Sequence, residues 1–144
     1  MSAARELIEN LELAPHPEGG WYRETWRAPV FAGERASATA IHFLLEANQS
    51  SHWHRVDAAE IWLWHAGDPL LLSLADSDAG PVETTILGPD LTGGMEVQHV
   101  IPPAQWQAAR PAAKEHGFVL VSCIVSPGFE FSGFELAPKN WSPG

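Results

Sequence analysis

The sequence is poor in cysteine, in basic residues and in long apolar runs, and each shortage excludes a class of protein. One cysteine in 144 residues, Cys123, allows no disulfide within the chain, and a reducing, cytoplasmic compartment is expected. Eight basic against eighteen acidic residues give a net charge of −10, which disfavours nucleic acid and anionic membrane surfaces as partners. No apolar run could span a bilayer, and residues 1–10 do not resemble a signal peptide.

The sequence also has few residues with helical periodicity. Only residues 3–11, where Leu7, Ile8 and Leu11 have helical spacing, predict a helix. Short apolar or alternating runs between Pro, Gly, Asn and Asp predict strands at residues 21–26, 38–45, 60–65, 70–74, 82–87, 96–101, 106–110, 118–125 and 129–136. This regular spacing predicts an all-β antiparallel sandwich or barrel with a short N-terminal helix. We expect a single domain over residues 1–144, with the helix in 1–12 and the barrel in 13–140.

The most informative segment runs from His52 to Gly67. It reads His52-Trp53-His54, then five residues, Glu60, then six residues, Gly67. On an extended strand two histidines two residues apart leave from the same face, and Glu60 can return on the neighbouring strand. A His-x-His pair alone arises by chance with a probability of roughly one third here, but adding Glu and Gly at set distances lowers that below roughly one per cent. The segment therefore predicts a metal site or a proton-transfer site.

These residues resemble the first signature motif of the cupin superfamily, with one additional residue before the Glu. Residues 102–107 lie where the second motif, Pro-x-Gly-x-x-His, is expected, but Ala104 replaces its glycine and Gln107 its histidine. Residues 15–23, 59–62, 66–69 and 126–131 resemble one cupin subfamily described as predicted sugar epimerases, by similarity to the dTDP-sugar epimerases. The resemblance implies a double-stranded β-helix, or jelly-roll barrel, a small-molecule ligand and a homodimer.

Two chemistries are open for the pocket that a cupin barrel would enclose. In the first, His52, His54 and Glu60 hold one divalent metal, Fe, Mn, Ni or Zn, with Gln107 as a fourth ligand. An amide oxygen is a poorer ligand than the imidazole it replaces, so the metal would be weakly held. In the second, no metal is bound, and one histidine of the pair takes a proton while Glu60 orients it.

Other residues are candidates for contact with a substrate. Period two on an extended strand places Trp62 and Trp64 on the same face as Glu60, where they would form indole walls for a sugar or planar ring, or else fill the core. Tyr22, the only tyrosine, could act as a general acid. The remaining candidates for binding a substrate are Glu18, Arg23 and Thr39.

The sequence is compatible with three functions. The first is an isomerase or epimerase that acts on a sugar or sugar nucleotide by acid–base chemistry. The second is a metal-dependent dioxygenase or related oxidoreductase. The third is a non-catalytic protein that binds a small molecule. All three place the ligand in the same pocket, so they differ in chemistry and not in location.

Overall fold

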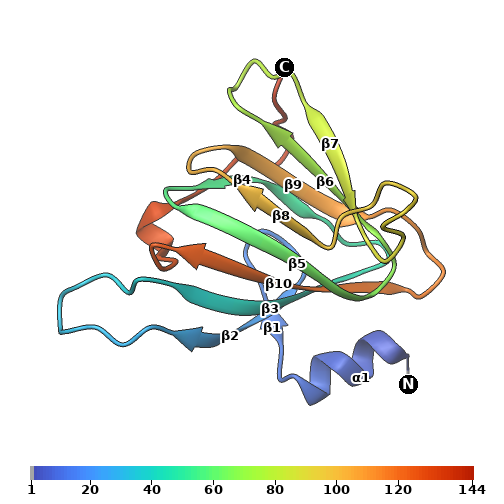
Figure 1. Cartoon of the computed structure of the whole chain (residues 1–144), viewed down its shortest axis with the longest axis horizontal. Coiled ribbons are helices and arrows are strands. Elements are labelled where there is room, and N and C mark those ends of the chain that lie inside the picture. Colours follow the sequence, from blue (N-terminus) through green and yellow to red (C-terminus); the bar gives the residue numbers. More distant parts are fainter. Residues whose placement is uncertain (1) are drawn as a thin grey trace.

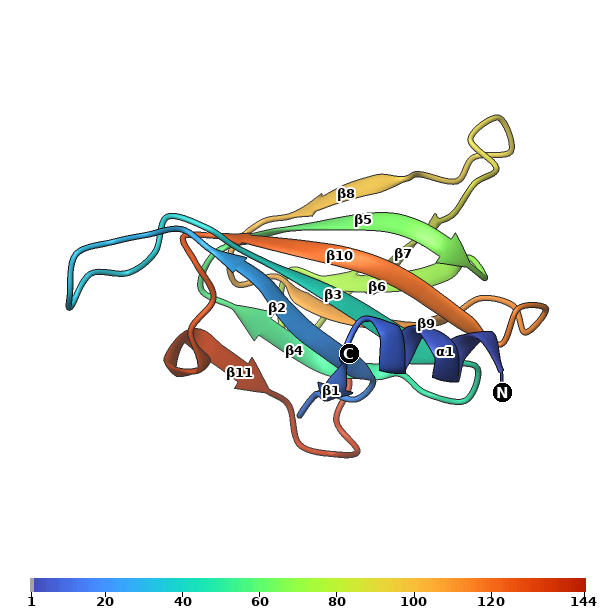
Figure 2. The ribbon, with the colours of Figure 1, turned by 90° about the horizontal axis from the view of Figure 1, so that it is seen from below.

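Two antiparallel sheets face each other in the computed structural model, which describes residues 2–144 (Figure 1, Figure 2). One sheet has the strand order β1-β2-β3-β10-β5-β8, and the other has the order β11-β4-β9-β6-β7. The elements are α1 (Ala3–Asn10), β1 (Ala14–Pro15), β2 (Trp21–Arg27), β3 (Thr39–Glu46), β4 (Ser51–Val56), β5 (Ala59–Gly67), β6 (Leu70–Ala75), β7 (Glu83–Leu87), β8 (Gln98–Ile101), β9 (Trp106–Pro111), β10 (Phe118–Ser126), the short 3-10 helix η1 (Phe131–Gly133) and β11 (Phe134–Leu136). The predicted all-β fold with a short N-terminal helix is confirmed.

Helix α1 lies against the outer face of the six-stranded sheet. The side chain of Ser2 caps it by accepting a hydrogen bond from the amide of Arg5, 3.2 Å away. Its buried residues Ala4 and Ile8 pack with Leu44 and Phe118, which lie on β3 and β10. The helix therefore covers one end of this sheet face and contributes nothing to the space between the sheets. Across residues 2–144 no helix is long and apolar enough to cross a bilayer.

The main core fills the space between the sheets with side chains that alternate along the strands. Leu70, Leu72 and Leu74 of β6 point inward and pack with Phe43 of β3 and Trp62 of β5. Burying each such side chain stabilises the fold by about 1.5–3 kcal/mol. A smaller apolar cluster, centred on Val56, Ala58 and Val125, lies apart from this core and includes part of the pocket lining described below.

The C-terminal segment differs from the expected single strand over residues 129–136. The structure has the 3-10 helix η1 at Phe131–Gly133, followed by the three-residue strand β11. The amide of Asp57, the residue after β4, donates a hydrogen bond to the carbonyl of Gly133, at 3.0 Å, and a side chain at Gly133 would come within 2.4 Å of the Asp57 carboxylate. The turn brings Phe131 and Phe134 to the pocket between the sheets. A continuous strand would have run past this pocket.

Candidate functional site

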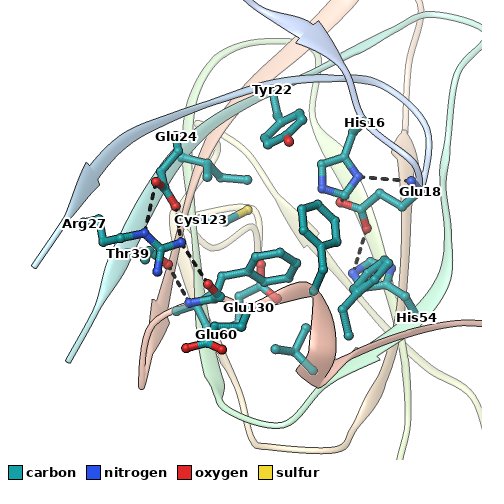
Figure 3. Close-up of a pocket in the computed structure, with 16 residues that line it drawn as sticks. His16, Glu18, Tyr22, Glu24, Arg27, Thr39, His54, Glu60, Cys123 and Glu130 are labelled. Carbon is teal, nitrogen blue, oxygen red and sulfur yellow. Dashed lines mark hydrogen bonds and ion pairs between the residues drawn. The ribbon is translucent and has the colours of Figure 1, made fainter. Parts of the chain in front are cut away.

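A cavity of about 360 Å³ opens between the two sheets (Figure 3). Side chains from β2, β3, β10 and β5 form one side of it, and β4 forms the other. The turn at residues 16–18 and the C-terminal segment at residues 129–134 complete the lining. The volume lies at the lower end of the range of about 300–1,000 Å³ that is typical of small-molecule pockets.

Strand β4 places His54 in this pocket by means of a β-bulge. Ser51 pairs with Ala109 of β9 and His54 pairs with Gln107, so the register shifts by one residue between them. The extra residue puts Ser51 and His54, three apart in sequence, on the same inward face, and both side chains are buried. His52 consequently faces away, and its Nε2 lies 2.9 Å from the carbonyl oxygen of Pro138.

Glu18 reaches the same point from the turn before β2. The turn closes because the amide of Gly19 donates to the carbonyl of His16, at 3.0 Å, and Gly19 and Gly20 both have positive φ. The buried carboxylate of Glu18 accepts a hydrogen bond from the hydroxyl of Ser51, at 2.8 Å. Its oxygen Oε2 lies 2.8 Å from Nε2 of His54. The bulge and the turn thus converge on one buried contact, the Glu18–His54 pair.

Both nitrogens of His54 face oxygen acceptors, so both carry protons. Nδ1 lies 2.7 Å from the carbonyl oxygen of His52, which can only accept, and Nε2 lies against the Glu18 carboxylate. Burial opposes the charged ring, but the charge of Glu18 and its hydrogen bond outweigh that cost and raise the pKa of His54 to about 9. Burial likewise opposes the ionised form of Glu18, but His54 holds its pKa below the usual value. At neutral pH the Glu18–His54 pair is a buried ion pair.

Glu60 has a different environment, because no cation pairs with it directly. Its Oε1 accepts a hydrogen bond from the side-chain amide of Gln107, at 2.9 Å, and the buried thiol of Cys123 lines the same pocket. Burial raises the pKa of Glu60 to about 7; the charge of His54 opposes this rise and that of Glu18 adds to it. Glu60 is therefore a buried carboxyl group that gains and loses a proton near neutral pH.

His16 forms the part of the lining next to Glu18, and its ring is neutral. Nδ1 accepts a hydrogen bond from the amide of Glu18, at 3.1 Å, so the ring proton is on Nε2. Burial lowers the pKa of His16, Glu18 opposes this and the charge of His54 adds to the lowering. Its ring centroid lies 4.4 Å from that of Tyr22 in an edge-to-face contact. The pocket thus contains one charged and one neutral imidazole.

The structure brings only some of the residues predicted from sequence to the pocket. His54 and Glu60 line it, but His52 does not, because the bulge in β4 breaks the period-two pattern on which that expectation depended. Trp62 lies on the same face as Glu60, as expected, but it packs deeper in the core and donates a hydrogen bond to Oε1 of Gln107, at 3.0 Å. Gln107 is buried beneath the pocket and holds Glu60 in place.

The other predicted residues are similarly divided. Tyr22 and Thr39 line the pocket, and the hydroxyl of Thr39 accepts a hydrogen bond from the amide of Phe129, at 2.9 Å. Trp64 donates to the carbonyl of Asp68, at 3.0 Å, and packs against the main core. Arg23 is half exposed and pairs with Glu12 outside the pocket. The expected indole walls are therefore absent from the described lining.

Phenylalanines take the place of those tryptophans. Phe129, Phe131 and Phe134 form an aromatic wall, in which each ring meets the other two edge to face with centroids 5.0–6.0 Å apart. The strand prediction for residues 129–136 hid their convergence, because alternation along one straight strand would have sent Phe134 to the opposite face from the other two. His16 was also missed, although its place between Pro15 and Pro17, just before the Gly19-Gly20 turn, could have indicated a side chain held against Glu18.

The residues present do not fit a resident divalent metal. Both nitrogens of His54 already donate hydrogen bonds, so the ring has no free lone pair. Gln107 presents its N–H group to Glu60, and its oxygen accepts from Trp62 in the core. His52 faces the other side of β4. Among residues 2–144 no group of three or more His, Cys, Asp or Glu side chains is placed to hold a metal ion. The expected set of His52, His54, Glu60 and Gln107 is not assembled.

Comparisons with known proteins place this geometry in a family context. A family model described as "Cupin superfamily (DUF985)" matches residues 5–137. A protein from Shewanella oneidensis is 40% identical over 95% of this chain and 85% of its own, with a TM-score of 0.85. A hypothetical protein from Leishmania major is 34% identical over 95% of this chain and 88% of its own, with a TM-score of 0.83.

More distant structures share the fold alone. Oxalate decarboxylase from Bacillus subtilis is 12% identical, with a TM-score of 0.63 over 85% of this chain and 29% of the other. At that identity the likeness supports the barrel and carries no inference about substrate. A search of curated proteins gave no match.

Proposed function

The chain belongs to the cupin superfamily, in the family described as DUF985, and from this premise we propose that it is an isomerase with Glu60 as its acid–base group. The observation that carries the proposal is the buried Glu60 carboxyl group, which lines the pocket and has a pKa raised by burial to about 7. A general base is most effective when its pKa lies near the working pH, because it is then both available and basic. Ordinary surface carboxylates do not meet this condition.

In the proposed reaction, ionised Glu60 removes a proton from a substrate carbon next to a carbonyl group. The electron pair of the broken C–H bond moves onto the carbonyl oxygen, and protonated Glu60 later returns the proton to the same or the adjacent carbon. The charge of the His54 ring favours the negative charge that develops on the substrate. His54 itself is already protonated at neutral pH, so in this proposal it is a source of positive charge and Glu60 is the base.

Inversion at a carbon needs a second group that delivers the proton to the opposite face. Tyr22 fits this role, because it lies on β2 and Glu60 lies on β5 of the same sheet, with β3 and β10 between them. Figure 3 shows their side chains on different sides of the pocket. The narrower proposal is therefore an epimerase, as the subfamily resemblance implies, that acts on a substrate of monosaccharide size. The cavity of about 360 Å³ supports this size over that of a complete sugar nucleotide.

The test is the uptake of deuterium from solvent into a panel of monosaccharides and related carbonyl compounds. We expect the wild type to incorporate deuterium, with a rate that rises with pH through about 7, and Glu60→Gln to lose at least about a hundredfold of it. Tyr22→Phe is expected to keep exchange but to lose inversion. Glu115→Gln is the matched control, since Glu115 is exposed and outside the pocket. Undiminished exchange in Glu60→Gln would contradict the proposal.

A further inference from the structure

The charges that line the pocket are unequal. Its lining includes four carboxyl groups, those of Glu18, Glu24, Glu60 and Glu130, but only one guanidinium, Arg27, and one charged imidazole, His54. We propose that the pocket binds an organic cation, either a protonated amine or a quaternary ammonium group. This inference rests on the proposed function in one respect, because it names the chemical class of the substrate for the same site.

Each cation of the lining is already paired with a carboxylate. His54 is paired with Glu18, at 2.8 Å, and Arg27 donates two hydrogen bonds to Glu24, at 2.7 and 3.2 Å. A third hydrogen bond ties Arg27 to the carbonyl of Phe129, at 3.0 Å. Two carboxylates, Glu60 and Glu130, remain without a paired cation of their own in the described part of the chain. A ligand cation would supply the missing charge.

Glu130 is exposed at the rim of the pocket, and its charge has only a weak effect on the pKa of Arg35. The hydrogen bonds that Arg35 donates to the Asp57 carboxylate are the main cause that raises the pKa of Arg35, and the charge of Glu130 is the smallest contribution to it. Arg35 is held by Asp57 through two hydrogen bonds, at 3.0 and 2.7 Å, so it is not free to turn to Glu130. The rim carboxylate therefore keeps an unmatched negative charge.

The aromatic wall (Phe129, Phe131 and Phe134) supplies the second element of cation recognition. The face of an aromatic ring carries negative electrostatic potential and attracts a cation within about 6 Å. The neutral His16 ring extends this wall, with its centroid 6.1 Å from that of Phe134 and 6.4 Å from that of Phe131. Phe131 remains 54% exposed, so a ligand with methyl or methylene groups around its charge would also bury this apolar surface.

Anionic ligands lack a matching partner in the same pocket. Phosphate and carboxylate groups are usually held by guanidinium groups that are free to bind them through two hydrogen bonds. Arg27 is bonded to Glu24, and Arg23 is outside the pocket and bonded to Glu12. The net charge of −10 on the whole chain also repels anions at a distance. The structure therefore favours an amine-bearing substrate over a sugar nucleotide.

Three probes of the same shape and different charge test the proposal. Choline is the cation, 3,3-dimethylbutan-1-ol is its neutral isostere, and 3,3-dimethylbutanoate is an anion with the same branched end. Calorimetric titration of the full chain at pH 7 should show choline binding about tenfold or more tighter than the neutral probe. The anion should bind weakest. The proposal would be overturned if choline and the alcohol bound with equal affinity, or if the anion bound more tightly than choline. It would also be overturned if choline showed no binding even at concentrations well above millimolar.

Two variants identify the source of the preference. Phe131→Leu keeps apolar bulk but removes the ring, so choline affinity should fall roughly threefold to thirtyfold while affinity for the alcohol stays unchanged. Glu130→Gln should also weaken the binding of choline and leave the binding of the alcohol unchanged. The control Glu115→Gln makes the same change of net charge and should weaken the binding of neither ligand. A choline preference that both pocket variants leave intact would contradict the assigned site.

The outcomes separate this inference from the proposed function. If choline binds selectively but no substrate exchanges deuterium, the ligand class stands and the isomerase proposal is wrong. If Glu60-dependent exchange occurs but the probes show no preference for positive charge, the isomerase stands and the ligand class is wrong. A substrate panel extended to amino sugars then connects the two, because their exchange should be faster than that of the corresponding neutral sugars.

Discussion

Three buried side chains, Glu18, His54 and Glu60, carry the ionisable groups at the inner end of the pocket. Glu18 and His54 form a buried ion pair through a contact of 2.8 Å, and Glu60 remains outside that pair. An ion pair removed from water is held together by its partners, and loss of one partner leaves the other buried without compensation. The same residue types on the surface would have ordinary pKa values and little effect on stability. Because these three groups are buried, gain or loss of a proton by any of them should change the free energy of unfolding measurably.

Replacing His54 by Leu should expose this dependence. The change keeps similar bulk but leaves Glu18 buried without its cation, so the free energy of unfolding at pH 7 should fall by about 3–5 kcal/mol. The double variant Glu18→Gln, His54→Leu should be more stable than the single one, because the uncompensated charge is gone. Urea unfolding followed by tryptophan fluorescence measures both. A loss below about 1 kcal/mol in the single variant would show that Glu18 and His54 are not a buried ion pair.

Glu60 should make stability depend on pH in the opposite sense to a paired carboxylate. Its pKa is about 7 in the folded chain, against 4.5 for an unperturbed glutamate such as that of the unfolded chain. As pH rises, the unfolded chain therefore loses this proton at a lower pH than the folded chain does. The free energy of unfolding should therefore fall as pH rises from 4.5 through about 7, by about 3 kcal/mol in total. The measurement is the difference in unfolding free energy between Glu60→Gln and wild type from pH 4.5 to 8.

The Glu18–His54 pair is present in both proteins, so their difference reports on Glu60. In the wild type the contribution of His54 is complete below pH 6.5 and lost as pH rises through about 9. Glu60 adds to the rise in the pKa of His54, so the comparison is read below about pH 8, where His54 is still protonated in the wild type. The Glu60→Gln variant should gain stability relative to wild type across the measured range. A difference that stays constant with pH would mean that Glu60 ionises in the folded chain as it does in water.

At the scale of single elements, the bulge in β4 shows where prediction from sequence stops. The motif from His52 to Gly67 marks the pocket correctly, because His54 and Glu60 both line it. Strict alternation then predicts that His52 joins them. One extra residue in β4 turns His52 outward and replaces it with Ser51. Nothing in the local sequence signals the bulge, since it arises from pairing with β9, which is distant in the chain.

Strand β5 shows a related limit. Period two correctly places Trp62 on the same face as Glu60, but it fixes only the face and not the depth along the strand. Trp62 is 1% exposed and lies among the leucines of the core, whereas Glu60 lies at the pocket. The residues that do form the aromatic wall come from the C-terminal segment. Their position depends on η1, which the apolar pattern of residues 129–136 did not predict.

The turn before β2 offers a prediction at this scale. Gly19 has a φ of 109°, and a side chain there would meet the carbonyl oxygen of Ser50 at 2.1 Å. Gly33 has a φ of 85°, but nothing lies within 4 Å of its missing side chain. Gly33→Ala should therefore cost only the strain of positive φ, about 1 kcal/mol. Gly19→Ala should cost at least about 2 kcal/mol more, because backbone must also move.

Thermal unfolding of the two alanine variants, together with deuterium exchange, measures this difference. Because Glu18 adjoins Gly19, displacement of the turn should also disturb the Glu18–His54 pair and lower exchange in Gly19→Ala alone. Equal stability of the two variants would show that the backbone of the turn can move to accept a side chain without loss of stability. It would then not be the element that fixes Glu18.

At the scale of the whole molecule, the sequence predicted the fold more completely than the chemistry. Short alternating runs separated by Pro and Gly predict most of the strands and many of their inward faces, and this is sufficient to predict a two-sheet barrel. The interior then divides into a leucine-rich core and a pocket, and that division depends on packing between strands distant in sequence. The homodimer implied by the cupin resemblance stays a prediction, which light scattering of the purified chain would test.

The arrangement of donors also leads to a prediction about metals for the molecule as a whole. His54 presents no free nitrogen, and His52 faces away from Glu60, so a metal would have to break the Glu18–His54 pair before binding. We expect Fe, Mn, Ni and Zn salts to leave the melting temperature unchanged, and chelation to leave deuterium exchange unchanged.

A metal held at a hundred times its dissociation constant would add about 2.7 kcal/mol. For a chain of this length that corresponds to a rise of roughly 5–10 °C in melting temperature, which is readily measured. Elemental analysis of protein purified without chelators gives an independent answer. A stoichiometric metal together with such a rise would show that the Glu18–His54 pair opens to release a nitrogen of His54. The chemistry of the pocket would then have to be assigned to the metal, with Glu60 as a ligand in place of a base.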